Sequence, residues 1–356
     1  MTRAGARETA VRVLAPIGAA TAALALASLV LAGLGHAPLP ALRALATGAF
    51  GSGAGLTATL LKAGPLLLTG LAVALSFRCG VWNIGAEGQL YAGALVSTAI
   101  ATRLAPASAG AWLVALALLG GAAGGACFGA LAGWLRAARG VSEVVSTLLL
   151  NFVAIQLVAW AIQGPLQEAA RAYPQSDAFP PAAVLPAWGR LHLGLPLALG
   201  LAFAVSALLT RTALGFRLRA VGASPEAARF AGLSPERFGT LALSLAGALA
   251  GLAGAAEIAG ITGRLYEGLS PGTGYTAIAV ALLARLDPLA VVPSALFFGA
   301  LASGAGAMQR EAGVPSVATL VVQGLVVLLS IGFALGPAGL RAALRRSAAS
   351  QPEGGG

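Results

Sequence analysis

The few side chains in this sequence that could take part in chemistry lie within or beside long apolar segments. The motif WNIGAEGQ holds Asn83, Glu87 and Gln89, and the segment VSEVVSTLLLNF holds Glu143 and Asn151. A charged side chain inside a membrane span costs about 3 kcal/mol on insertion scales, and buried amides are also costly. Such residues are therefore functional hypotheses by default.

Two interpretations of these polar groups remain open at the level of sequence. They could line a path for a substrate, or they could hydrogen-bond between helices that Gly85 and Gly88 allow to approach closely. Asn151 is near the middle of its segment, with an aromatic residue beside it, and Glu257 lies toward the outer end of a later segment. The predicted substrate-path residues are Asn83, Glu87, Gln89, Asn151, Phe152 and Glu257.

No catalytic constellation is present in the sequence. It has no Walker P-loop, no Gly-x-Ser-x-Gly and no His-Glu-x-x-His. Cys79 and Cys127 form neither a disulfide framework nor a metal-ligand cluster, and the two histidines are far apart in sequence. We therefore expect neither a metal site nor an enzyme.

The composition identifies lipid as the main solvent of this chain. Of 356 residues, 58% are hydrophobic and 10% are charged, with a mean hydropathy of +0.86. Soluble domains have about 25% charged residues, so this chain could not cover a water-exposed surface. The net charge of +10 comes from arginines that lie mainly between apolar segments, where they set topology. Nucleic-acid binding is therefore not expected.

The apolar segments predict an all-α membrane protein, a polytopic bundle of about ten transmembrane helices. Each segment approaches the roughly 20 residues that a membrane helix needs. The third and eighth are rich in glycine or polar residues and could be broken or re-entrant. The predicted spans are 11–34, 56–77, 84–102, 110–135, 141–163, 191–210, 239–262, 272–285, 288–308 and 315–335.

Arginine placement predicts that both termini are cytoplasmic. With ten spans and the N-terminus inside, 15 arginines fall in inside segments and 6 in outside segments. This asymmetry is the one that the positive-inside rule describes. Nine or eleven spans would move the C-terminal arginines outside, so an even count is favoured.

The expected organisation is a single transmembrane domain at 11–340, between a cytoplasmic segment at 1–10 and a disordered cytoplasmic tail at 341–356. Two connections are longer than turns. The outside loop at about 164–190 is rich in proline, which disfavours a regular helix, and we expect it to cover the outer mouth. The inside loop at about 211–238 is flanked by arginines.

The inside loop contains the signals of a short surface helix. Ser224, Pro225 and Glu226 provide a serine cap, a proline at the first position and an acid near the positive helix end. Alanines continue the helix, and Gly232 can end it. A second start follows at Ser234-Pro235-Glu236.

Five blocks of the sequence resemble one family in the same order. They are FRCGVWNIGAEGQLYAGAL, VSEVVSTLLLNFVA, AVGASPEAARFAGLSPERF, GLSPGTGYTAIAVALLARLDPLAVVPSALFFGAL and VPSVATLVVQGLVVLL. They resemble bacterial permeases for nucleosides and simple sugars, a branch of the group that includes the branched-chain amino acid and ribose permeases. The third block is similar to the EAA-x-x-x-G loop by which permeases of ATP-binding-cassette (ABC) importers dock on their ATPase.

The resemblance implies a multi-pass protein of the bacterial inner membrane, with two permease subunits around a central path. The second permease is expected to be a different chain. Two cytoplasmic ATPases would bind ATP-Mg, so this chain itself would bind no cofactor, and a lipoprotein or periplasmic binding protein would deliver the substrate. The residues implied in ATPase coupling are Ser224, Pro225, Glu226, Ala227, Ala228, Arg229 and Gly232.

Closure of the ATPases would then move the helix at 224–232 and switch the side on which the permease opens. Arg217, Arg219 and Arg229 could pair with acids on the ATPase. Ribose-like sugars or branched-chain amino acids are the alternative substrates. From another class, an ion-coupled secondary transporter could use Glu87 or Glu257, although that class gives no reason for the inside loop.

Overall fold

The computed structural model describes residues 35–103 and 112–315, together with residue 110 and short runs between 21 and 33 and between 321 and 328. By internal packing the chain divides into two units. One unit is residues 53–302, and the other combines residues 1–52 with 303–356. The single permease domain of 11–340 stays a prediction.

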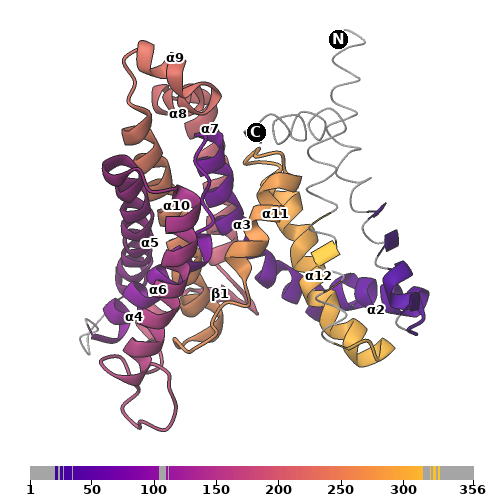
Figure 1. Cartoon of the computed structure of the whole chain (residues 1–356). Coiled ribbons are helices and arrows are strands. Elements are labelled where there is room, and N and C mark those ends of the chain that lie inside the picture. Colours follow the sequence, from indigo (N-terminus) through magenta and orange to yellow (C-terminus); the bar gives the residue numbers. More distant parts are fainter. Residues whose placement is uncertain are drawn as a thin grey trace, which may run out of the picture. The chain divides into compact units, whose positions relative to one another are not determined.

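The unit at 53–302 is a helical bundle (Figure 1). Its long helices are α3 (Gly53–Arg78), α4 (Ala86–Arg103), α5 (Trp112–Arg139), α6 (Glu143–Gln163), α7 (Gly194–Arg211) and α10 (Pro235–Glu257). A π-helical turn, η2 (Ile258–Thr262), extends α10, and the shorter α11 (Thr273–Leu283) follows; α12 (Val291–Ala312) begins in this unit.

Among the described residues, six helices are long and apolar enough to cross a membrane. They are α3, α5, α6, α7, α10 with its η2 extension, and α12. The predicted segments at these positions are therefore confirmed as helices of membrane length. The predicted spans 11–34 and 315–335 lie largely outside the described residues, so the count of ten and the cytoplasmic position of both termini stay predictions.

The third and eighth predicted spans differ from the others in the structure. α4 has 18 residues and begins with a polar turn, and it is not among the six helices of sufficient length and hydropathy. α11 has 11 residues, which is about 16 Å of helix against a hydrocarbon core of about 30 Å. The eighth segment is therefore too short to cross as one helix, because its helix begins at Thr273, after the irregular connection from η2, and ends at Leu283.

The helices α4, α5 and α10 pack through backbone, with glycines in place of side chains. A methyl group added at Gly251 of α10 would lie 2.9 Å from the Cα of Gly125 in α5 and closer still to the Gly121 carbonyl oxygen. Gly93 of α4 faces the same part of α10. These glycines therefore bring the three helices into close contact, and we call this contact the glycine seam.

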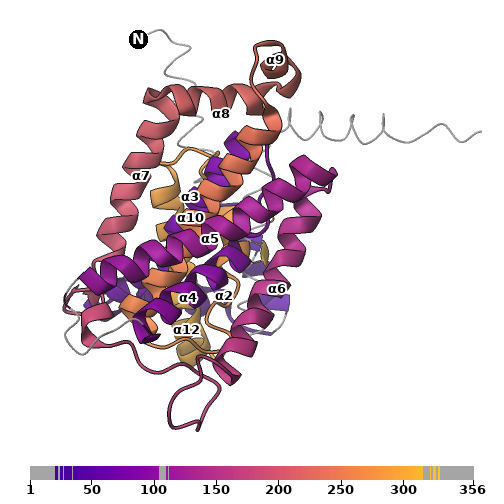
Figure 2. The same ribbon diagram turned by 90° about the vertical axis from the view of Figure 1, so that its left-hand side faces the viewer.

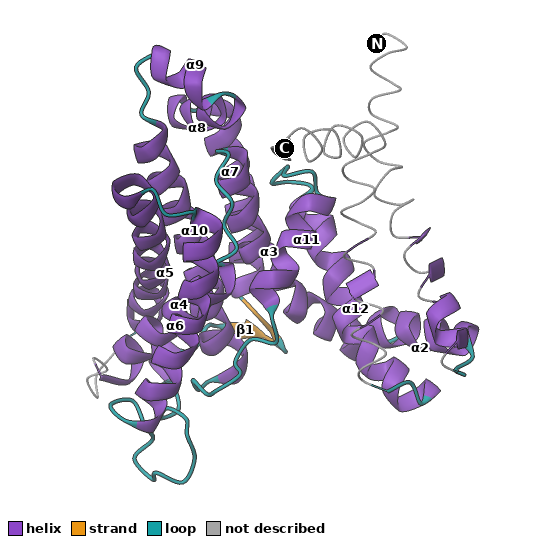
Figure 3. Ribbon diagram, in the orientation of Figure 1, coloured by secondary structure: helices purple, strands orange, loops and turns teal. Residues whose placement is uncertain are grey.

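Irregular segments lie at both ends of this bundle. At one end, α8 (Ala213–Ala223) lies across the ends of α7 and α10 and leads into the short α9 (Pro225–Phe230) (Figures 1 and 2). At the other end is the loop at 164–190, with the 3-10 turn η1 (Pro181–Ala183) and a hairpin (Figure 3). The predicted inside and outside loops thus occupy opposite ends, as loops on two sides of a membrane must.

The hairpin pairs β1 (Ala187–Trp188) with β2 (Leu191–His192) in antiparallel register. Its two-residue turn begins with Gly189, whose φ is 64°. Such turns favour glycine because its φ can be positive without steric cost. The Trp188 side chain at this turn is 94% exposed.

The second unit contains α2 (Pro38–Phe50), a helix that the predicted spans did not include. Proline at its first turn suits a helix start, but its 13 residues are too few to resemble a span. The core of this unit is apolar. It is formed by Leu31, Ala41, Met308 and Val314, with Leu45 and Ala312 packed against it.

Candidate functional site

Asn83 and Gln89 form a reciprocal amide pair at the entrance to α4. The Asn83 Nδ2 donates to Gln89 Oε1 at 3.0 Å, and the Gln89 Nε2 donates to Asn83 Oδ1 at 3.2 Å. The backbone N–H of Gly85 also donates to Asn83 Oδ1, at 2.9 Å. Both side chains are almost fully buried. The pair therefore fixes the turn between α3 and α4.

Asn151 connects α6 to two other elements. Its Oδ1 accepts from the Gly88 backbone N–H at 2.7 Å, and its Nδ2 donates to the Ile84 carbonyl at 2.9 Å and to the Tyr275 hydroxyl at 3.2 Å. The side chain is fully buried. One amide thus satisfies groups on the turn before α4, on α4 itself and on α11, and we call Asn83, Gln89 and Asn151 the amide cluster.

Glu87 holds the start of α11. Its Oε2 accepts from the backbone N–H of Gly274 at 2.6 Å, and the side chain is 2% exposed. The first N–H groups of a helix have no partner within the helix, and its N-terminus favours negative charge. One turn along α4, the Tyr91 hydroxyl accepts from the Ser270 N–H at 3.1 Å. α4 therefore anchors the connection into α11 at two points.

The structure thus brings four of the six predicted path residues together, and their side chains form hydrogen bonds with other groups of the same chain. Asn83, Glu87, Gln89 and Asn151 are buried and hydrogen-bonded in the way that the structural interpretation describes. Their contact with a substrate stays a prediction. The signal available in the sequence was the pair of glycines in the NIGAEGQ motif, which indicates close backbone approach.

Phe152 and Glu257 lie apart from this cluster. Phe152 follows Asn151 but points to the outer face of α6, where its side chain is 59% exposed. Glu257 is the last residue of α10 before the π-helical turn and is partly buried. Among the described residues the Glu257 side chain has no hydrogen bond or ion pair. It differs in this from Glu143, whose carboxylate pairs with Arg136 at 3.2 Å.

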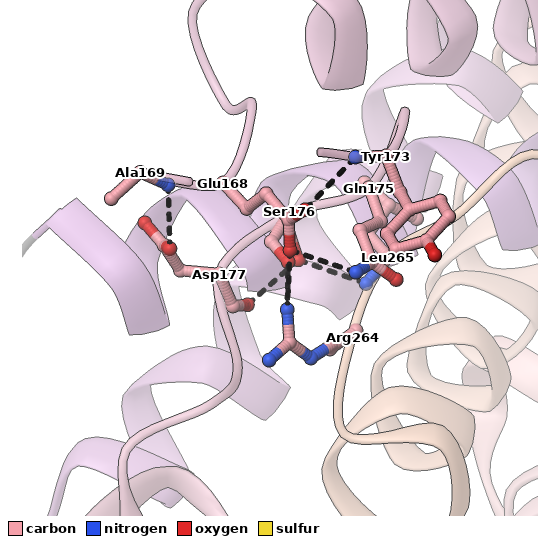
Figure 4. A network of polar contacts seen from close by, with 8 residues as sticks. All are labelled: Glu168, Ala169, Tyr173, Gln175, Ser176, Asp177, Arg264 and Leu265. Atoms are coloured by element: carbon pink, nitrogen blue, oxygen red, sulfur yellow. Dashed lines mark hydrogen bonds and ion pairs between the residues drawn. The ribbon is translucent and has the colours of Figure 1, made fainter. Parts of the chain in front are cut away.

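The loop at 164–190 is held by a polar network at its end of the bundle (Figure 4). Arg264, just after η2, contacts the Glu168 carboxylate at 2.8 Å and the Ser176 carbonyl at 3.3 Å. Ser176 and Leu265 exchange two hydrogen bonds, from the Ser176 N–H at 2.8 Å and to the Ser176 Oγ at 2.9 Å. We call Glu168, Gln175, Ser176, Arg264 and Leu265 the outer network. It fixes the loop to the connection between α10 and α11.

Hydrogen bonds to Glu168 favour its charged form. The Gln175 amide donates to Oε2 at 2.7 Å and the Tyr173 N–H donates to Oε1 at 3.0 Å. The Gln175 bond is the largest cause that holds the pKa of the Glu168 carboxyl below its ordinary value, and the Tyr173 N–H and Arg264 add to it against the opposing effect of desolvation. The network is therefore complete only while this carboxyl is ionised.

At the opposite end of the bundle, the predicted surface helix is present as α9. The Ser224 Oγ accepts from the Ala227 N–H at 3.3 Å, with Pro225 at the first helical position. The chain turns back at Gly232, whose φ is 78°, and α10 begins at Pro235 as the second start predicted. Ser224 through Gly232 therefore form one compact turn at the tip of the bundle.

Two side chains of α9 differ from what the sequence suggested. Arg229 forms an ion pair with Glu236 of α10, so its charge is already neutralised within the chain. Phe230, which was not among the predicted site residues, is 95% exposed. With Glu226 and Arg229 it lines an open hollow of about 540 Å³. Phenylalanine is among the residues enriched in protein–protein interfaces.

The helix α8 connects this tip to the amide cluster. A methyl group at Gly222, near the end of α8, would lie 2.9 Å from the Cys79 carbonyl carbon and closer to the Arg78 carbonyl oxygen. The turn at Arg78–Gly80 leads within three residues to Asn83. A displacement of α8 would therefore push directly on the segment that the amide cluster holds.

Six helices of membrane length among the described residues identify a multi-pass membrane protein. The chain belongs to the family described as "Branched-chain amino acid transport system / permease component", whose model matches residues 55–331. This is the larger group that the five sequence blocks indicated.

Several known ABC transporter permeases are similar to this chain over most of its length. A glucose ABC transporter permease of Haloferax volcanii is 38% identical over 89% of this chain and 86% of its own length. A guanosine ABC transporter permease of Bacillus subtilis is 33% identical over 88% and 92%, and a nucleoside ABC transporter permease of Lactococcus lactis is 29% identical over 90% and 92%. A second guanosine permease of B. subtilis is 28% identical over 68% and 78%.

The bonds of Asn151 predict a large loss of stability when its amide is removed. The variant Asn151→Ala leaves the Gly88 N–H and the Ile84 carbonyl without their buried partner, at a cost of about 1–3 kcal/mol for each such group. We expect a clearly lower melting temperature in detergent than for Val153→Ala, an exposed apolar position on the same helix. Equal melting temperatures for the two variants would show that the amide does not stabilise the bundle.

The outer network predicts a pH-dependent loop. The pKa of Glu168 is lower in the folded protein than in the unfolded chain. The stability that its ionised carboxyl gives the loop is therefore fully present above the unfolded-state pKa of about 4.3, and it is lost as the pH falls through the folded-state pKa. Limited proteolysis within 164–190 should therefore accelerate at acidic pH in the wild type. The variant Glu168→Gln should be cleaved faster already at pH 7, and Glu267→Gln, an exposed position, should match the wild type. Slow cleavage of Glu168→Gln at pH 7 would contradict this role.

Proposed function

We propose that this chain is one of two permease subunits of an ATP-driven importer that moves nucleosides or related small sugars across the bacterial inner membrane. Relatives named as guanosine, nucleoside and glucose ABC permeases, aligned over nearly the whole chain, support this substrate class. In this proposal ten helices surround part of a central path, both termini are cytoplasmic, and ATP-Mg is bound and hydrolysed by a separate chain.

The observation that most supports this function is the tip formed by α9. Phe230 is almost fully exposed on a helix of six residues that contributes little to the packing of the bundle. Burying a phenylalanine side chain is worth about 2–3 kcal/mol. A groove on a cytoplasmic ATPase would provide that burial, and the short, exposed side chain of Ala227 allows close approach to it. Ala228 is buried and instead packs α9 onto its own chain.

The charges around the tip have separate roles in this proposal. Arg229 is paired with Glu236, and it therefore shapes the turn rather than meeting an acid on the partner. Arg217 of α8 is exposed and stays available for such an acid. Glu226 lies beside Phe230 in the hollow, where a change of charge would oppose docking.

Movement of the ATPases would reach the path through backbone contacts. Pressure on α9 displaces α8, and Gly222 of α8 lies against the turn at Arg78–Gly80. That turn continues into the amide pair of Asn83 and Gln89. Asn151 of α6 then binds Gly88, next to Gln89, and Tyr275 of α11. Each step joins groups in direct contact, so the tip and the interior are mechanically connected.

The partners follow from the same proposal. Two guanosine permeases of one organism both match this chain, which favours a second, different permease beside it. A lipoprotein or periplasmic binding protein would deliver substrate to the end that holds the loop at 164–190. Ion coupling through Glu87 is less well supported, because its carboxylate already accepts a hydrogen bond from Gly274. Glu257, whose side chain has no partner among the described residues, stays the candidate for that alternative.

Docking through α9 predicts that a tagged form of this chain captures an ATPase from native membranes. The variant Phe230→Ala should lose most of it, because truncation of an interface aromatic anchor costs about 2 kcal/mol or more, and Glu226→Arg should lose it as well. Phe203→Ala, an exposed aromatic position of α7, is the matched control and should behave as the wild type. Capture that is unchanged in both α9 variants would place the docking surface elsewhere.

The substrate class is tested by uptake in cells that contain the complete transporter. Labelled guanosine should accumulate in an ATP-dependent manner that persists when an uncoupler removes the ion gradients. Unlabelled nucleosides should compete more strongly than glucose, ribose or leucine. Stronger competition by glucose or ribose would assign a sugar, and stronger competition by leucine a branched-chain amino acid. Uptake abolished by the uncoupler while ATP is maintained would instead indicate ion coupling.

A further inference from the structure

Three helices of the unit at 53–302 have extensive exposed faces, and two of these faces are apolar. α5 exposes apolar side chains and Cys127 between its ends, at Leu116, Leu119, Ala123, Cys127, Leu131 and Trp134. The exposed face of α7 is likewise apolar from Leu197 through Phe203 to Ala207. Such faces are compatible with lipid chains, which offer no hydrogen bonds.

The exposed face of α6 is different. Between Val145 and Trp160 its exposed residues follow helical spacing, and all but one are apolar; they are Val145, Leu148, Leu149, Phe152, Val153, Gln156, Leu157 and Trp160. The exception is Gln156. It lies seven residues before the end of α6 at Gln163, which is about 10 Å along the helix axis, and thus within the hydrocarbon core.

An amide at this depth is unfavourable against lipid. Moving an amide from water to hydrocarbon without a partner costs about 4–8 kcal/mol on cyclohexane scales. Among the described residues Gln156 has no hydrogen-bond partner within the chain, whereas Asn151, five residues earlier, has three. An unpaired amide on this face of α6 therefore favours water or protein, rather than lipid, as its neighbour.

We propose that Phe152, Gln156 and Trp160 form a contact strip for the planar ring of a nucleoside, on the wall of the substrate path that faces the second permease. This inference rests on the proposed import function and adds the residues that meet the substrate. Phe152 was already a predicted path residue, and the proposal adds the amide of Gln156 and the ring of Trp160 to it.

The spacing of the strip suits a planar ligand with polar edges. Gln156 is one helical turn from each aromatic residue, about 6 Å along the axis. The rings are 59% and 65% exposed, so their faces are available for stacking. Stacking of a base on an aromatic side chain is worth about 1–3 kcal/mol, and the amide can both donate to and accept from a base edge or a ribose hydroxyl.

The amide cluster orients this strip. Asn151 is buried on the side of α6 that faces α4 and α11, and its three hydrogen bonds fix the rotation of the helix about its axis. Phe152 is the next residue, and Gln156 follows one turn later. Residues that contact a ligand are most accurately placed when such buried partners hold the element that bears them.

The test is the reaction of an introduced cysteine with a water-soluble, membrane-impermeant methanethiosulfonate. The parent is Cys127→Ala, because Cys79 is buried. To it are added Gln156→Cys or, as the matched control on a lipid-facing helix, Phe203→Cys. Since the reagent reacts with the thiolate, which forms in water, the Gln156→Cys variant should react at least about tenfold faster in open membrane fragments. Guanosine at saturating concentration should slow that reaction, and sucrose should not.

Two results would overturn the strip. Reaction of Gln156→Cys as slow as that of Phe203→Cys would mean that the face is covered by protein or lipid, including the other unit of this chain. Fast reaction without protection by guanosine would mean a water-filled wall that the substrate does not touch. Neither result depends on ATP-driven uptake, so the strip and the proposed import function can fail separately.

A kinetic measurement adds a readout that does not need cysteine. Trp160→Ala should raise the guanosine concentration for half-maximal uptake by about fivefold or more, from the loss of about 1 kcal/mol or more of stacking. The matched control is Trp134→Ala on α5, whose side chain is exposed to a similar extent. If Trp160→Ala and Trp134→Ala need the same guanosine concentration for half-maximal uptake, guanosine does not stack on Trp160.

Discussion

The structure depends on one constraint: a polar group within the membrane has no water to bind, so the protein must supply its partner. Asn151 shows how this is met, because one amide satisfies the Gly88 N–H, the Ile84 carbonyl and the Tyr275 hydroxyl. Glu87 does the same for the first turn of α11. These residues make irregular backbone possible at membrane depth, and the turn before α4 and the start of α11 both require it.

The two ends of the bundle are held by different kinds of interaction. At the end that holds the loop at 164–190, the Glu168 carboxylate, the Arg264 guanidinium and the Ser176 backbone contact one another, and their strength depends on ionisation. At the other end, α8 meets the turn at Arg78–Gly80 through Gly222, with backbone in direct contact. The first kind of contact responds to pH and salt, whereas the second transmits displacement under any condition in which the bundle is folded.

Sequence reasoning predicted the helices well where composition alone determines them. The six long apolar helices and the start and end of α9 follow from hydropathy, caps and turn residues, which are local signals. It missed α2, whose 13 residues are too few to form a hydropathy signal. It also did not find Phe230, because exposure at the tip of α9 depends on how the chain folds around it. Of the two amides on α6, Asn151 was the predicted path residue and Gln156 was not considered. Only the packing of α4 and α11 shows that Asn151 faces inward and Gln156 outward.

The glycine seam limits how this protein can change shape. Where α4, α5 and α10 meet, backbone rests on backbone, and there are no long side chains whose rotamers could adjust while the helices slide. The three helices should therefore move together as a rigid block. Rearrangement that opens one side of the membrane or the other is then confined to elements outside the seam, and the π-helical turn η2 with the connection to α11 is a natural hinge at its border.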